Sequence, residues 1–248
     1  MFNLEKQNAL HKAQLYRLLV CFLDDEKTAP HIFFKGGTCT AMLGFLDRFS
    51  VDLDFDLQKG ANKQKLRREL HTIFKDLGLE ISDESKPALQ FFLKYQAPEN
   101  QRNTIMLEIL DNPFLTIDYR AQYLRAINRT AICQTQESIF ANKLVALTDR
   151  YKKRKTVAGR DVYDIHYFFS QGYNYKQEII RERTGKSALA YLKELKMFIN
   201  DKMSQAIINQ DINFLLSYEK FKALSKTLKM ETLTMLEDEI KKLSQKEK

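Results

Sequence analysis

The stretch "FFKGGTCTAMLGFLDRFSVDLDFDL", residues 33–57, places two adjacent glycines ahead of a short apolar run and then three aspartates at every second position. Its last seven letters alternate between apolar and acidic residues, which predicts a β-strand. Alternate side chains of a strand share one face, so Asp52, Asp54 and Asp56 are expected together, opposite a buried apolar face. Successive carboxylates would lie roughly 7 Å apart along the backbone, which allows them to converge on one or two divalent ions.

An isolated DxD pattern does not establish a metal site, because an acidic, solvated strand face is the commoner explanation. An EF-hand loop is excluded, since its sixth position would be Leu57 instead of glycine and its twelfth Lys63 instead of glutamate. Glycosyltransferases and metal-dependent nucleases also use paired aspartates. The residues that precede the pair therefore have to decide between these classes.

The two glycines, Gly36 and Gly37, lie between "HIFF", which predicts a short buried strand, and "TCTAMLGFL", which predicts a helix with Thr38 near its N-cap. Glycine permits positive φ and a close approach of the backbone to a ligand. Backbone N–H groups at such a turn, ahead of a helix N-terminus, suit phosphate oxygens, and the Thr38 hydroxyl can add a hydrogen bond. A glycine turn followed by DxD on the next strand is much more specific than either feature alone.

The remaining pattern predicts an α+β fold with a mixed sheet. Helices are expected over residues 4–23 and over "NKQKLRRELHTIFKDLG", which Gly78 closes. Strands are expected at "ALQFFLKYQ", "RNTIMLEIL" and "LTIDYR". After about Thr130 the pattern becomes helical, beginning with "TQESIFANKLVALTDRYKK" and "RDVYDIHYFFS" and continuing with about four more helices. We therefore expect an α/β domain over residues 1–134 and a helical domain over residues 135–248.

Composition narrows the class of protein and its partners. The 248 residues are 44% hydrophobic, enough for a sizeable core, and their net charge of +8 favours polyanions such as nucleic acid or nucleotides. The three cysteines are far apart and form no zinc-type spacing, which is typical of a reduced cytoplasmic protein. No signal peptide or membrane-spanning segment is expected, so we predict a cytoplasmic location.

The glycine turn and the aspartates together resemble the first motif of the nucleotidyltransferase superfamily. More closely, the stretch resembles the "KGGT…RFS.DLDF" signature of the AbiEii/AbiGii toxin family, nucleotidyltransferase-like toxins of bacterial toxin–antitoxin and abortive-infection phage-defence systems. The matching residues are Lys35, Gly36, Gly37, Thr38, Arg48, Phe49, Ser50, Asp52, Leu53, Asp54 and Phe55.

A second segment, residues 135–169, resembles the family's "EKL.AL..R…RD.YDL" pattern. Its matching residues are Lys143, Leu144, Ala146, Leu147, Arg150, Arg160, Asp161, Tyr163 and Asp164. One departure is Asn142, where the family usually has glutamate before the lysine. The two segments and the intervening strands cover roughly residues 30–170. The resemblance implies that the α/β domain, residues 1–134, is nucleotidyltransferase-like and that the helical domain, residues 135–248, contributes to the active site.

The resemblance implies a metal-dependent transfer of a nucleotide from an NTP, with Mg²⁺ (or Mn²⁺) held by Asp52 and Asp54. It implies that Lys143 is a triphosphate ligand and that Asp161 has an essential active-site role, whereas Asp164 is expected to be structural, paired with Arg160 or another cation. The residues expected to bind the nucleotide are Lys35, Gly36, Gly37, Thr38, Arg48 and Ser50. Arg48 could equally tie its loop to an acid.

A third metal-binding carboxylate is expected on a neighbouring strand in this superfamily. Glu108 in "TIMLEIL" is the best candidate, and Asp111 and Asp118 are rivals. A surface or ion-paired acid at a strand edge explains Glu108 equally well. Asp56 lies outside the family match and is expected to be a bystander.

The basic run "RYKKRK", between the two motif helices, is an expected contact for RNA phosphates. The residues are Arg150, Lys152, Lys153, Arg154 and Lys155. A solvated loop is the alternative explanation of this run. "KLRR", residues 65–68, is a weaker second basic patch.

The resemblance suggests an RNA acceptor, with the tRNA 3′ end as the leading candidate, and a toxin that blocks translation and growth. It also implies a cognate antitoxin encoded nearby. Alternatives are nucleotidylation of a protein or small molecule, or a non-catalytic NTP- or RNA-binding module of the same fold. The intact aspartate pair argues against such a module, because binding alone does not need two metal-holding carboxylates.

Overall fold

The computed structural model describes residues 4–111 and 113–246. The helices are α1 (Leu4–Asp24), α2 (Gly36–Met42), α3 (Lys63–Asp76), α4 (Gln136–Arg154), α5 (Gly159–Ser170), α6 (Gln177–Thr184), α7 (Ala188–Lys202), α8 (Gln205–Ile212), α9 (Tyr218–Leu224) and α10 (Leu228–Lys246). The strands are β1 (Ile32–Lys35), β2 (Asp52–Leu57), β3 (Glu80–Glu84), β4 (Leu89–Lys94), β5 (Thr104–Leu110), β6 (Tyr119–Leu124) and β7 (Arg129–Gln134), with short 3₁₀ turns at Ala29–His31 and Arg125–Ile127.

The chain forms two compact units, which we call unit 1 and unit 2. Unit 1 takes the described residues of Met1–Phe45, Phe49–Pro113 and Asp118–Gln134. Unit 2 takes those of Leu46–Arg48, Phe114–Ile117 and Thr135–Lys248. Two short segments of the first 134 residues therefore belong with the helices.

Unit 1 contains a seven-stranded mixed sheet in the order β3-β4-β5-β2-β1-β7-β6. Strand β2 is central, antiparallel to β1 and parallel to β5. The strand that carries the aspartates therefore has neighbours on both sides. This sheet confirms the predicted α+β class with a mixed sheet.

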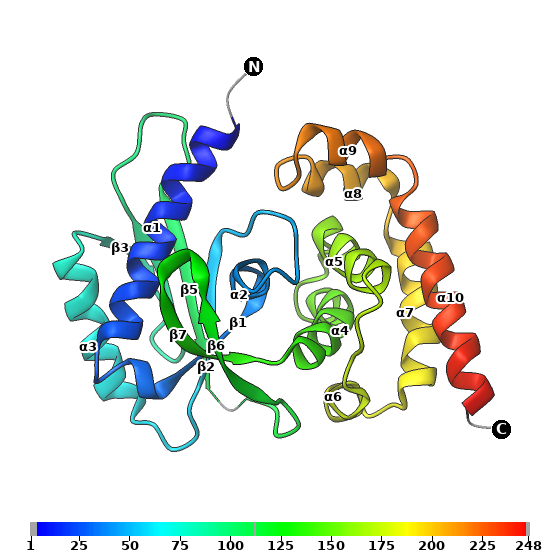
Figure 1. The fold of residues 1–248 in the computed structure, drawn as a ribbon, viewed down its shortest axis with the longest axis horizontal. Helices are drawn as coiled ribbons and strands as arrows, with labels where there is room; N and C mark the ends of the chain where they lie inside the picture. Colours follow the sequence, from blue (N-terminus) through cyan, green and yellow to red (C-terminus); the bar gives the residue numbers. More distant parts are fainter. Residues whose placement is uncertain (1–3, 112, 247–248) are drawn as a thin grey trace. The chain divides into compact units, whose positions relative to one another are not determined.

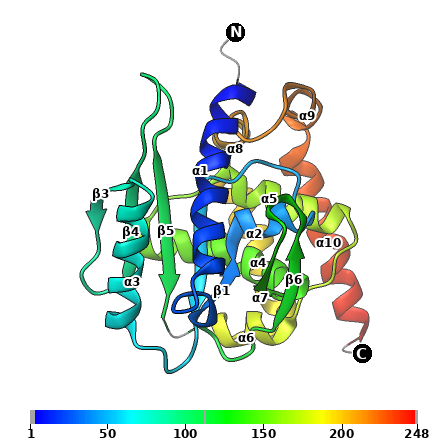
Figure 2. The ribbon, with the colours of Figure 1, turned by 60° about the vertical axis from the view of Figure 1, so that its left-hand side comes forward.

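The apolar face of β2 forms the core of unit 1. Phe55 is fully buried and stacks on Phe34 of β1, with 5.1 Å between ring centroids. Phe22 of α1 meets the edges of both Phe55 and Phe74 of α3. Helices α1 and α3 thus cover one face of the sheet (Figures 1 and 2), while α2 packs against β1 and β2.

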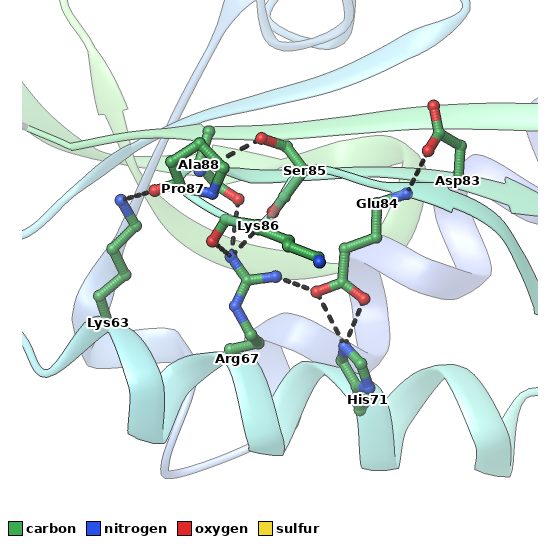
Figure 3. A network of polar contacts seen from close by, with 9 residues as sticks. All are labelled: Lys63, Arg67, His71, Asp83, Glu84, Ser85, Lys86, Pro87 and Ala88. Carbon is green, nitrogen blue, oxygen red and sulfur yellow. Dashed lines mark hydrogen bonds and ion pairs between the residues drawn. The ribbon is translucent and has the colours of Figure 1, made fainter.

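The β3–β4 loop is fastened to α3 by a polar network (Figure 3). Arg67 pairs with the Glu84 carboxylate and donates to the backbone carbonyls of Ser85, Lys86 and Ala88. The guanidinium also lies over the Phe91 ring, 5.4 Å from its centroid. Arg67 is the third residue of the basic patch "KLRR", and these contacts give this cation a structural role.

Unit 2 is helical. In α4 the apolar face expected from the sequence is buried, and its members are Ile139, Phe140, Leu144 and Leu147. Helix α10 packs on α5 and α7 (Figure 1). Side-chain N-caps from Thr135 and Ser187 explain where α4 and α7 begin. Among the described residues, no helix combines the length and the hydrophobicity that crossing a membrane requires.

Several element predictions need correction. Helix α2 begins at Gly36, two residues before the expected N-cap Thr38. Strands β3 and β7 were not expected, because β3 is largely exposed and β7 has only short apolar stretches. The last expected strand, "LTIDYR", occurs later, as β6. Within the described residues, five helices follow α5, close to the four or so expected.

Candidate active site

The three aspartates of β2 share one face of the sheet, as predicted, but their environments differ. On the opposite face Leu53 and Phe55 are fully buried. Asp52 and Asp54 are half-buried, whereas Asp56 is completely buried. The acidic row is therefore two partly accessible carboxylates followed by one enclosed carboxylate.

The Gly36 turn packs directly against Asp54, which explains why the glycines and the aspartates occur together in sequence. Gly36 has φ +76, a left-handed conformation that favours glycine. A Cβ added there would overlap the Asp54 carboxylate and lie 2.7 Å from its Cβ. Only glycine therefore combines this backbone conformation with this close approach.

Glu108 lies beside Asp54. The parallel pairing of β2 with β5 sets Asp54 opposite Glu108, so both side chains project from the same face. Gln90 of β4 donates to Glu108 at 3.3 Å. Of the rivals, Asp111 pairs with Lys63 and Asp118 precedes β6 at the far edge of the sheet.

The carboxylates do not converge on a single point in this structure. Within residues 4–111 and 113–246, no three histidine, cysteine, aspartate or glutamate side chains are grouped closely enough to hold a metal ion. The register of Asp54 and Glu108 supplies oxygen donors of the kind Mg²⁺ prefers, side by side on one face. The two carboxylates are ligands of the type that the implied metal prefers, and they lie on the same face of the sheet. To bind one ion together, their side chains would have to turn toward it.

Asp56 is enclosed in a polar cluster of its own, which the sequence did not predict, and its expected status as a bystander to the reaction stays a prediction. Its carboxylate pairs with the Lys35 amine at 2.5 Å and accepts hydrogen bonds from the Tyr119 hydroxyl at 2.7 Å and the Gln134 amide at 2.6 Å. Burial, and then the adjacent Asp56 charge, raise the pKa of Tyr119, so its hydroxyl stays a donor. We call these four residues the Asp56 cluster. Lys35, expected to bind nucleotide, is here the counter-ion of Asp56.

The neighbouring Thr38 and Ser50 also belong to unit 1. The Thr38 hydroxyl donates to the backbone carbonyl of Asp52 at 2.5 Å, which ties α2 to the start of β2. Ser50 is half-buried in the segment just before β2. A nucleotide-binding role of these two residues stays a prediction.

Unit 2 holds a second completely buried carboxylate, Asp164 of α5. It accepts two hydrogen bonds from Arg48, at 2.5 and 2.8 Å, and pairs with Lys143 of α4 at 2.7 Å. Burial acts to raise the pKa of Asp164, but the charges of Arg48 and Lys143 outweigh it and hold the pKa at about 2. We call these three residues the Asp164 cluster.

The Asp164 cluster brings together three residues for which the sequence analysis predicted separate roles. Asp164 is ion-paired, as predicted, and of the two alternatives considered, Arg160 or another cation, the second is observed, with Arg48 and Lys143 as partners. The alternative considered for Arg48, a tie from its loop to an acid, is the arrangement observed. Lys143 keeps 16% of its side chain exposed, and an ammonium group has three donors, so its bond to Asp164 leaves capacity for an anion.

Asp161 lies in the first turn of α5 and pairs with Arg150 at 3.0 Å. Sequence reasoning missed Asp47, which accepts a hydrogen bond from Tyr163 and pairs with Lys220 at 2.6 Å. Burial is the main cause that raises the pKa of Tyr163. Tyrosine and lysine give no sequence signal for such a contact.

The basic run forms the last turns of α4 instead of a loop, with Lys155 as its left-handed C-cap. Arg150 is engaged by Asp161, whereas the other four cations are exposed. The Lys155 amine and the Lys202 amine of α7 both lie over the Tyr151 ring, 5.5 and 5.9 Å from its centroid. The structure therefore adds Lys202 to this basic surface, which we call the α4 basic surface.

Solved structures that share the fold include two from Helicobacter pylori. A candidate nucleotidyltransferase from Helicobacter pylori aligns with a TM-score of 0.60 and 20% identity, over 96% of this chain and 97% of that one. JHP933 from Helicobacter pylori aligns with a TM-score of 0.53 and 19% identity, over 98% of each chain. No curated protein gives a significant match.

A family model described as "Nucleotidyl transferase AbiEii toxin, Type IV TA system" matches residues 17–232. The match spans both the glycine–aspartate stretch of unit 1 and the Lys143–Asp164 segment of unit 2. It thus extends well beyond the residues that suggested the family. The chain belongs to the AbiEii family of nucleotidyl transferase toxins, of type IV toxin–antitoxin systems, and is a nucleotidyltransferase.

Proposed function

We propose that the protein transfers a nucleotide from an NTP to an RNA acceptor, the 3′ end of tRNA, with release of pyrophosphate, and thereby blocks translation and growth. The observation that carries this proposal is the packing of the Gly36 turn under Asp54. A turn that can bind phosphate oxygens and a carboxylate that can bind a metal are thereby held against each other. A nucleoside triphosphate with its divalent ion needs both.

The residues expected to hold the divalent ion are Asp52, Asp54 and Glu108. When bound there, Mg²⁺ would neutralise phosphate charge and orient the acceptor for in-line displacement at the α-phosphate. The contribution of the chain itself is to fix these carboxylates on one rigid face of the sheet. The backbone N–H groups at Gly36 and Gly37 would donate to phosphate oxygens.

Unit 2 supplies positive charge to the reaction in this proposal. The Asp164 cluster contains two cations and one anion, so it carries a net charge of +1. Lys143 is the partly exposed member, and it would balance the charge of the departing pyrophosphate. Asp161, held by Arg150, is proposed as the second essential residue of this unit, as the family resemblance implies.

The α4 basic surface is the proposed contact for the RNA backbone. It presents three exposed cations in the last turn of α4, Lys155 at its C-cap and Lys202 on α7. Cations of this kind bind phosphate without reading sequence, so they would raise affinity and its dependence on salt. In this proposal the cognate antitoxin neutralises the same activity.

A labelling assay tests the proposal. The protein is incubated with each α-labelled NTP, Mg²⁺ and total cellular RNA, beside Asp54→Ala. A matched control is Asp76→Ala, which changes an exposed aspartate of α3 in the same unit. Label in tRNA for the wild type and Asp76→Ala, but not for Asp54→Ala, is the expected result.

The other outcomes separate the alternatives. Label in protein or in a small molecule would replace RNA as the acceptor. If the protein binds NTP but no fraction is labelled, a non-catalytic binding module is the remaining alternative. A second readout is growth arrest on expression, which Asp54→Ala and Lys143→Ala should each abolish. Arrest that persists in both variants would overturn the mechanism.

A further inference from the structure

The Asp56 cluster is an enclosed and electrically balanced group beside the Gly36 turn. The Asp56 carboxylate has no exposed surface and receives one ion pair and two hydrogen bonds. Its single negative charge is matched by Lys35, since Tyr119 and Gln134 are neutral donors. A carboxylate with these partners is not arranged to take a metal ion.

Lys35 connects this cluster to the turn. It is the last residue of β1 and the N-cap of α2, directly before Gly36. The antiparallel pairing of β1 with β2 sets Lys35 opposite Asp54 and Phe33 opposite Asp56, so all four side chains project from the same face. The side chain that Asp56 holds therefore belongs to the residue from which the turn departs.

The cluster also links β6 and β7 to β1 and β2 beside the Gly36 turn. Tyr119 and Gln134 are paired residues of β6 and β7, and the Tyr119 ring packs on Phe33 with 4.8 Å between centroids. Strand β7 meets β1 through a single paired position, Phe34 with Cys133. Side-chain bonds to Asp56 thus supplement a short backbone ladder next to the turn.

We propose that Asp56 is a positioning residue for nucleotidyl transfer: it anchors Lys35, and through Lys35 it holds the Gly36 turn in the conformation that receives the triphosphate. The inference deepens the proposed function and rests on it. It assigns Lys35 an indirect role, in which its amine pairs with Asp56 instead of contacting the nucleotide.

Three variants test this inference: Asp56→Asn, Lys35→Met, and the two combined. Two quantities are measured, the Kd of the incorporated NTP with Mg²⁺ and the kcat and KM of transfer to RNA. A displaced turn should raise Kd and KM roughly tenfold in each single variant, with kcat changed much less. Because both substitutions break the same link, the combined variant should be no worse than either alone.

A direct role for Lys35 predicts the opposite pattern. If the Lys35 amine binds the triphosphate, Asp56→Asn would leave NTP binding unchanged or tighten it, while Lys35→Met alone would weaken it. That result would overturn the inference. Equal NTP binding and kinetics in all three variants would overturn it too.

Controls separate a positioning effect from a folding effect. Asp24→Asn breaks another ion pair of unit 1, the exposed contact with Arg129, and should change neither Kd nor KM. If Asp56→Asn does not fold, Tyr119→Phe removes one hydrogen bond from the same carboxylate and should raise KM roughly two- to threefold. A wild type that binds NTP but transfers nothing would remove the proposed function, and the Kd series would still decide the inference.

Discussion

Each unit of the molecule buries one aspartate completely, and the two surround it differently. In unit 1, Asp56 is met by one cation and two neutral donors. In unit 2, Asp164 is met by two cations, Arg48 and Lys143. The Asp56 cluster is therefore neutral, whereas the Asp164 cluster carries a net positive charge.

The difference separates two uses of a buried ion pair. In the neutral Asp56 cluster the charge of the lysine is matched, and the cluster holds strands and a turn in place. The Asp164 cluster contains a partly exposed lysine, and the remaining donors of its ammonium group can receive an anion. We therefore interpret the Asp56 cluster as architecture and the Asp164 cluster as architecture that also receives an anion.

The largest expected effect is that of Asp164→Ala on stability. It leaves Arg48 and Lys143 without their shared counter-ion in a buried setting, which should lower the free energy of unfolding by about 3–5 kcal/mol. Urea denaturation measures this change. The control is Glu194→Ala, which breaks an exposed pair with Lys186 in the same unit and should cost less than about 1 kcal/mol. Equal costs in the two variants would contradict the comparison.

Lys143→Met should separate activity from stability. Asp164 keeps its bidentate bond to Arg48, so the cluster becomes neutral and the free energy of unfolding should change by less than about 1 kcal/mol. Loss of the cation should nevertheless lower kcat for nucleotidyl transfer about 100-fold or more. Lys196→Met, which removes a lysine paired with Glu237 on the surface of unit 2, is the matched control. Full activity in Lys143→Met would contradict the proposal that Lys143 interacts with an anion during the reaction.

Asp56→Ala should cost less stability than Asp164→Ala. Lys35 retains 16% exposure and can turn its amine toward water, so the main loss is of hydrogen bonds, about 2 kcal/mol. Denaturation of both variants under one condition gives the ranking directly. A larger cost for Asp56→Ala would show that the neutral cluster is the more constrained of the two.

The sequence predicts the parts of unit 1 that depend on local pattern. Strict alternation in "VDLDFDL" is sufficient for β2 and its buried face, because one side of the strand has to be apolar. The position of Glu108 opposite Asp54 follows once two strands are paired, but the pairing itself is not in the sequence. Strand β3 was missed since its exposed residues carry no apolar period.

The two buried clusters could not be predicted, because their members are distant in sequence. Tyr119 and Gln134 lie 63 and 78 residues from Asp56, and Arg48 lies 116 residues from Asp164. Local spacing suggested Arg160 as the partner of Asp164, whereas tertiary packing brings Arg48 to it. The row of three aspartates gave no sign that its third member is enclosed.

The last expected effect concerns acid sensitivity, which should differ between the units. In unit 1, burial is the main cause that lowers the pKa of His11 to about 4, while its ring nitrogens contact the Tyr95 hydroxyl at 2.7 Å and the Val51 carbonyl at 2.8 Å. The unfolded chain takes up this proton near pH 6.5, so unit 1 should lose stability as pH falls from about 6.5 to 4.

The Asp164 cluster should respond at lower pH. Because its folded pKa is about 2, its contribution is fully present above the unfolded value of about 4 and is lost as pH falls from there toward 2. Amide hydrogen exchange between pH 7 and pH 4 can follow each unit separately. His11→Gln should flatten the profile of unit 1 and leave that of unit 2 unchanged. A loss of protection around Asp164 in this range that matches the loss around His11 would contradict the separate origin of the two responses.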